Sequence, residues 1–153
     1  MAALIDFTST NWSYYTIPVA FALCMIPHSY SMVLAGKNHD IGHPRKTEEH
    51  CAKDTSMDKA TVRRISRAKA AASNGFETLG LYAAAVVAGN VAGVATERMN
   101  QLTLAYVVSR VAYNYVYISL QDNARFAALR PLVWLAGIAV VMMLFVAAGK
   151  ALN

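Results

Sequence analysis

Charged residues are scarce in this chain. They make up 15% of its 153 residues, whereas a soluble globular domain carries about 25%. Hydrophobic residues make up 56%, and the mean hydropathy is +0.33. This composition excludes a disordered protein and argues against an ordinary soluble enzyme. The expected class is a small membrane protein with several spans.

Cysteines are few, and the common catalytic motifs are missing. Cys24 lies in an apolar run and Cys51 in a polar stretch, which argues against a disulfide between them and against a disulfide scaffold. The sequence contains no glycine-rich phosphate loop, no nucleophile elbow and no zinc-protease helix. His39, His43 and His50 share a polar stretch with Cys51 but fit no strong zinc pattern. We therefore expect no metal site.

The apolar residues gather in four runs that polar connections separate. These runs cover residues 13–35, 68–95, 101–120 and 131–148. A helix needs about 20 residues to cross a bilayer, which is close to the length of the shorter runs. We therefore predict that residues 1–153 form one all-α domain. Its expected architecture is an integral membrane four-helix bundle with up-down-up-down topology.

The basic residues are distributed unevenly between the connections. The formal net charge is +5, and most Lys and Arg residues lie between the first and second runs. The third connection adds Arg125 and Arg130, whereas the opposite side has only Arg98 and Lys150. An excess of Lys and Arg marks cytosolic loops, so the first and third connections are predicted to be cytosolic. Topology explains the charge better than DNA does, and we expect no nucleic-acid partner.

Two ionisable residues, Glu77 and Arg110, lie inside predicted spans, where a charge that faces lipid costs at least a few kcal/mol. Each is about 15 Å from the cytosolic end of its helix at 1.5 Å per residue, which predicts an ion pair between them. Such a pair can be structural or functional. Tyr106, Tyr113 and Tyr117 share a helix face with Arg110. Phenols in a helix are usually packed aromatics, but a cation among them is a ready site for a carboxylate or a thiolate.

These residues resemble motifs of the MAPEG family, the membrane-associated proteins in eicosanoid and glutathione metabolism. The second run matches the family's signature at four positions, which are Arg67, Ala71, Asn74 and Glu77. The third run is similar to the family's Arg-x-x-Tyr-x-x-x-Tyr pattern at Arg110, Tyr113 and Tyr117. Arg130 and Trp134 resemble the Arg and Trp that open the fourth helix in many members. With four predicted spans, the resemblance covers the whole chain.

The resemblance implies a homotrimer in the endoplasmic reticulum membrane, with glutathione bound between adjacent subunits. The residues that it implies as glutathione ligands are Arg67, Asn74, Glu77, Arg110, Tyr113 and Tyr117. Glu77 would take the ammonium group, and the arginines would take carboxylates. The cation that stabilises the thiolate is expected to be Arg130, with Arg125 second and Arg110 as a further catalytic candidate.

The resemblance favours an enzyme, a glutathione transferase or peroxidase that acts on a hydrophobic small molecule. Two alternatives stay open. Many members carry a basic residue at the position of Ala70 and a histidine at that of Ala72, and the absence of both motivates a glutathione-independent isomerase or cyclase on the same scaffold. The other alternative is a non-catalytic membrane protein that binds a lipid or a partner.

Overall fold

The computed structural model describes residues 7–153, and within this range it is helical and has no strand. The all-α prediction is therefore confirmed. The helices are α1 (Thr16–Ala35), α2 (Thr47–Lys53), α3 (Lys59–Val91), α4 (Thr96–Tyr115) and α5 (Leu129–Ala151). Short 3₁₀ turns form at Ser13–Tyr15, Gly36–Asn38, Pro44–Lys46 and Ala124–Phe126, and a π-helical turn at Val116–Leu120 continues α4.

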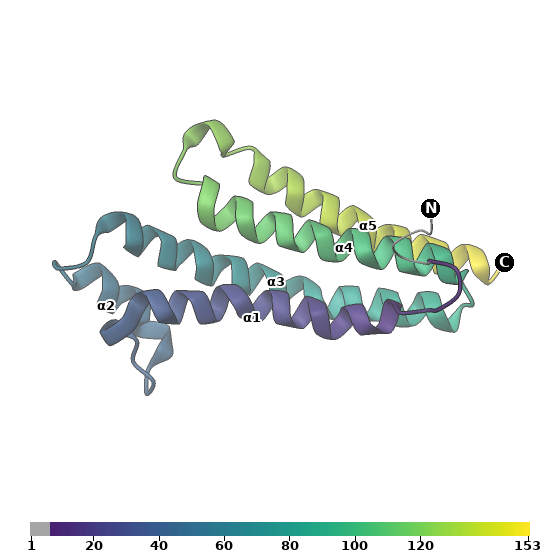
Figure 1. The fold of residues 1–153 in the computed structure, drawn as a ribbon, viewed down its shortest axis with the longest axis horizontal. Coiled ribbons are helices and arrows are strands. Elements are labelled where there is room, and N and C mark those ends of the chain that lie inside the picture. The colour runs from purple at the N-terminus through teal and green to yellow at the C-terminus, as the bar shows by residue number, and fades with distance from the viewer. Residues whose placement is uncertain (1–6) are drawn as a thin grey trace.

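The four long helices run along the long axis of the molecule, and successive ones point in opposite directions (Figure 1). α1 packs along α3, and α4 packs along α5. The α3–α4 turn and the C-terminus lie at one end, while α2 and the α4–α5 connection lie at the other (Figure 1). The first and third connections, which are predicted to share the cytosolic side, therefore lie at the same end of the molecule.

α3 begins earlier than the apolar run predicts. Its first residue is Lys59, because the Asp58 carboxylate caps the helix and accepts a hydrogen bond from the Thr61 N–H at 3.1 Å. It ends before a turn in which Gly93 has a φ of +76°. The helix has 33 residues, or about 50 Å at 1.5 Å per residue, which exceeds the roughly 30 Å hydrocarbon core. The sequence predicts its polar first turns as loop, and they make the helix begin before the apolar run.

Two segments are long and apolar enough to cross a membrane. They are Ser13–Asn38, which contains α1, and Ala124–Ala151, which contains α5. α3 and α4 carry more polar side chains along their length. That all four long helices cross the bilayer therefore stays a prediction.

The apolar core fills the half of the molecule nearer the α3–α4 turn. There the rings of Tyr82 and Tyr106 stack with centroids 3.7 Å apart, against buried residues such as Met99 and Leu144. α1 and α3 approach closely where Gly75 faces Cys24, since a Cβ at Gly75 would lie 2.7 Å from the Cys24 sulfur. The polar residues Asn74 of α3 and Arg110 and Tyr113 of α4 lie in the other half.

Candidate functional site

A small cavity lies where α3, α4 and α5 meet in this polar half. Its volume is about 180 Å³. The residues that line it are Asn74 from α3, Tyr113 from α4, and Arg130, Pro131 and Trp134 from α5. Asn74, Tyr113 and Arg130 are predicted site residues, so the fold brings together side chains that lie far apart in the sequence.

Tyr113 connects the helices around the cavity. Its side chain is 1% exposed, and its hydroxyl accepts a hydrogen bond from the Asn74 amide nitrogen at 3.0 Å. Its ring meets that of Tyr117 edge to face, with centroids 5.6 Å apart. Tyr106, the third tyrosine of this helix face, stacks on Tyr82 in the apolar core instead. Two of the three predicted phenols therefore belong to one polar cluster, which consists of Asn74, Arg110, Tyr113, Tyr117 and Arg130.

Two guanidinium groups lie over these rings. The Cζ of Arg130 is 4.9 Å from the Tyr117 ring centroid, and that of Arg110 is 4.4 Å from the Tyr113 centroid. Within residues 7–153, no carboxylate forms an ion pair with either arginine. Cation–π contacts stabilise a guanidinium but leave its charge in place. The cluster therefore offers two positive charges, and an anion is the ligand that they favour.

The predicted ion pair between Glu77 and Arg110 is not formed, so that expectation was wrong. Glu77 is exposed and accepts a hydrogen bond from the Ser73 hydroxyl, one turn away on α3. Arg110 is buried, with 5% of its surface exposed. The two residues share a depth along the helices, but Glu77 lies on the outer side of α3. Equal depth does not produce contact when the helix rotation turns one side chain outward.

The other predicted arginines lie in different places. Arg110 does not line the cavity and joins the cluster through the Tyr113 ring. Arg125 lies on the exposed 3₁₀ turn before α5, and it does not line the cavity either. Of the three arginines predicted to be catalytic, Arg130 alone lines this cavity.

Arg67 lies two turns below Asn74 on α3 and binds a carboxylate of this chain. Its Nη1 and Nη2 donate to the two carboxylate oxygens of Asp122 at 2.7 and 2.8 Å, and its Nε donates to the Ile118 carbonyl at 3.3 Å. These contacts hold the pKa of Asp122 below its ordinary value. Asp122 carries no motif that marks it in the sequence. Its place in the third connection, on the same predicted side as Arg67, is the signal that points to the contact.

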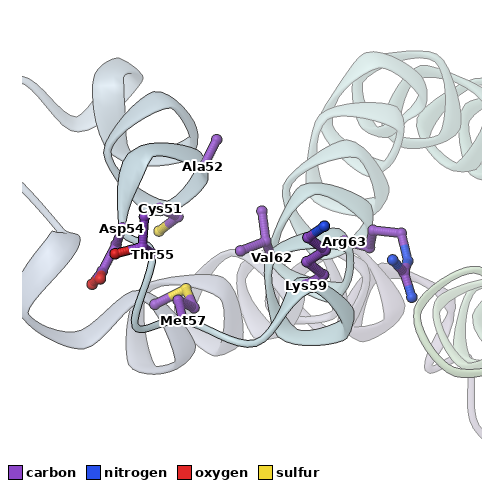
Figure 2. Close-up of a pocket in the computed structure, with 8 residues that line it drawn as sticks. All are labelled: Cys51, Ala52, Asp54, Thr55, Met57, Lys59, Val62 and Arg63. Carbon is purple, nitrogen blue, oxygen red and sulfur yellow. The ribbon is translucent and has the colours of Figure 1, made fainter.

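A larger cavity, of about 500 Å³, lies between α2 and the first turns of α3 (Figure 2). None of the predicted site residues lines it. The Asp54 carboxylate at its edge already accepts hydrogen bonds from the Asn38 amide and from Ser56, which hold its pKa well below the usual range. Figure 2 shows Arg63 extending away from Cys51, on the far side of α3. The larger cavity is therefore separate from the polar cluster at Tyr113.

Comparison with known proteins gives one family. The model of the MAPEG family matches residues 14–150. No curated protein and no solved structure matches the chain. The matched range contains all four long helices almost completely and every residue of the polar cluster. The chain is therefore a member of the MAPEG family, and it is a membrane protein.

Proposed function

We propose that the protein is a membrane-bound glutathione transferase or peroxidase that acts on a lipophilic electrophile. The observation that carries this proposal is the cavity in which Arg130, a cation without a carboxylate partner among residues 7–153, meets Asn74 and Tyr113. A cation beside a thiol raises the fraction of thiolate, which is the nucleophile. Membership of the MAPEG family supports glutathione as the thiol.

The spacing of two polar residues along α3 supports a tripeptide ligand. Arg67 and Asn74 are seven positions apart, or about 10.5 Å along a helix. An extended tripeptide spans about 10 Å. Glutathione laid along α3 would therefore reach from Arg67, which suits a terminal carboxylate, past Asn74, and its central cysteine would direct the sulfur toward the cavity that Arg130 lines.

The transferase reaction uses one glutathione thiolate for each molecule of electrophile. The sulfur of glutathione forms a bond to carbon of the electrophile, and the electron pair of the broken bond leaves with the leaving group or takes up a proton. In the peroxidase reaction, two glutathione molecules reduce one hydroperoxide to an alcohol and water and become a disulfide. Arg130 would stabilise the thiolate in both cases, and Tyr113 would orient the ligand through its hydroxyl. The apolar co-substrate would enter from the bilayer.

The surrounding assembly is part of the proposal. Glu77 is exposed on α3 although it lies within the predicted span, and an ionisable side chain there is costly against lipid. A homotrimer would cover it, and the glutathione ammonium group would pair with it at the subunit boundary. We further propose residence in the endoplasmic reticulum, with α2 and the α4–α5 connection in the cytosol, because Lys and Arg are concentrated there.

The test is glutathione binding to the detergent-purified protein by calorimetry, with ultraviolet absorbance of the bound thiolate. We expect binding with a thiolate signal in the wild type and loss of most of that signal in Arg130→Gln. Arg125→Gln is the matched control, because Arg125 lies on the 3₁₀ turn just before α5 and does not line the cavity. It should leave the signal unchanged.

Two results would count against the proposal. Binding without thiolate would favour an isomerase or cyclase that uses the tripeptide for structure. The absence of binding at millimolar glutathione would exclude a glutathione-dependent reaction. It would favour either an enzyme that converts an apolar substrate without a cofactor or a protein without catalytic activity.

A further inference from the structure

The ion pair between Arg67 and Asp122 is well formed and partly buried. Both carboxylate oxygens accept from the guanidinium, at 2.7 and 2.8 Å. The Arg67 side chain is 12% exposed and that of Asp122 is 35% exposed. Two parallel hydrogen bonds between an arginine and a carboxylate fix the geometry of the pair as well as its charge. The group that would receive a carboxylate of glutathione is therefore already occupied by one from the same chain.

We propose that Asp122 is an internal competitor for the ligand carboxylate at Arg67, so that glutathione must displace it to bind. This inference rests on the proposed function, because it assigns a regulatory residue to that same site. Glutathione and Asp122 offer the same chemical group to the same guanidinium, and both cannot hold its two terminal nitrogens together. The apparent affinity is then lowered by the fraction of molecules in which Arg67 is free.

The size of the cavity agrees with a site that is only partly open. Its volume is about 180 Å³, whereas pockets for small organic ligands span about 300–1,000 Å³. Arg67 also donates to the Ile118 carbonyl in the π-helical turn that carries Tyr117. The connection that follows leads through Asp122 to Arg130. Release of Asp122 would therefore free the segment between Tyr117 and Arg130, and Arg130 lines the cavity.

A second cation, Arg63, remains as a partner for Asp122 when a ligand displaces it from Arg67. The Nε of Arg63, one turn earlier on α3, lies 3.4 Å from Asp122 Oδ1. Asp122 thus faces two arginines of α3, and these three side chains together carry one excess positive charge. That excess favours the approach of an anion. When a ligand takes Arg67, Asp122 retains Arg63 as its partner, so displacement does not strand a bare carboxylate.

The experiment compares glutathione dissociation constants by calorimetry in detergent for the wild type and Asp122→Asn. The asparagine removes the competing charge, and we expect the affinity to rise about fivefold. Glu49→Gln is the control, because it also removes a paired carboxylate at this end of the molecule. The Glu49 carboxylate lies 2.6 Å from the Lys53 ammonium group and is outside the site. This control should leave the affinity unchanged. Thermal unfolding of each variant verifies that it is folded.

A double-variant comparison and amide hydrogen exchange sharpen the test. In an Arg67→Gln background, Asp122→Asn should no longer raise the affinity, since the contested guanidinium is gone. Glutathione should also speed hydrogen exchange in residues 120–128 of the wild type. An equal or weaker affinity of Asp122→Asn, while the wild type binds with a thiolate signal, would overturn the inference and leave the proposed function standing. No binding by either protein would overturn both.

Discussion

Tyr113 has more contacts in the polar cluster than its sequence motif indicates. Its hydroxyl accepts a hydrogen bond from Asn74, its ring and that of Tyr117 meet edge to face, and the Arg110 guanidinium lies over its ring. The side chain is almost completely buried. Tyr113 of α4 thus links α3 to the wall of the cavity. Its hydroxyl orients the Asn74 side chain at the cavity.

Removal of that hydroxyl should weaken both the fold and the site. In Tyr113→Phe, the half-buried Asn74 amide loses its acceptor, which costs about 1 kcal/mol of stability. Thermal unfolding in detergent should show a melting temperature lower by about 3 °C for a chain of this size, and calorimetry should show weaker glutathione binding. Tyr115→Phe is the control, because Tyr115 is 61% exposed. An unchanged Tyr113→Phe protein would contradict the assigned role of this hydroxyl.

The pH dependence of Asp122 follows from its two arginine partners. Hydrogen bonds from Arg67, and more weakly from Arg63, hold its pKa below the ordinary value. A carboxyl with a lower pKa in the folded state stabilises the fold above its unfolded pKa of about 4, and this contribution is lost as the pH falls through the folded value. Asp122 therefore stays charged near neutrality.

We accordingly expect the ratio of glutathione dissociation constants between the wild type and Asp122→Asn to be constant between about pH 6 and pH 8. Calorimetry at three pH values in this range measures it. A ratio that approaches one as the pH falls to 6 would mean that Asp122 takes up a proton there, contrary to the low pKa that its arginine partners impose.

At the scale of elements, α3 is in contact with each of the other helices. It packs along α1 at Gly75, carries Asn74 to the cavity, and extends past the expected membrane boundary to Arg67 and Arg63. Hydropathy predicts the apolar part of this helix but not its polar beginning or the short helix α2. The polar beginning of α3 is capped by Asp58, and a search for apolar runs does not detect such a cap.

The close approach of α1 and α3 gives a prediction at this scale. Gly75→Ala would place a Cβ 2.7 Å from the Cys24 sulfur, and overpacking of this kind costs about 1–3 kcal/mol. We expect a lower melting temperature in detergent. Cys24→Ala in the same chain should recover most of the loss, because it removes the clashing atom.

Gly149→Ala is the matched control for Gly75→Ala. A Cβ at Gly149, in the last turns of α5, meets no atom within 4 Å. The alanine should leave stability unchanged or raise it by up to about 1 kcal/mol through helix propensity. Equal effects of the two alanines would show that α1 and α3 are not in tight contact at Gly75.

At the scale of the whole molecule, one face of α3 is left uncovered. Four of its exposed residues are polar or small and recur at helical spacing, namely Ser73, Glu77, Gly80 and Ala84, and the exposed Val87 and Val91 continue the same face. Small side chains allow helices to approach closely in a membrane, and Glu77 is costly against lipid. This face is therefore the surface that we expect neighbouring copies to cover in the proposed homotrimer.

A bulky residue on this face should dissociate the assembly. We expect the wild type to sediment as a trimer in detergent and Gly80→Trp to shift toward the monomer, because the indole would hold the helices apart. Val33→Trp is the control, since Val33 is 78% exposed on α1 and lies outside this face. A Gly80→Trp protein that stays trimeric would place the subunit boundary elsewhere.

The sequence alone determined the helical class, the four long helices and the helix face shared by Arg110, Tyr113 and Tyr117, because hydropathy and helical periodicity are local properties of the chain. The tertiary structure decided which of these residues meet. Glu77 and Arg110 have matching depths but do not pair, whereas Arg67 finds Asp122 across 55 positions. Contacts between distant segments depend on how each helix is rotated about its axis, and that rotation is set by packing such as Gly75 against Cys24.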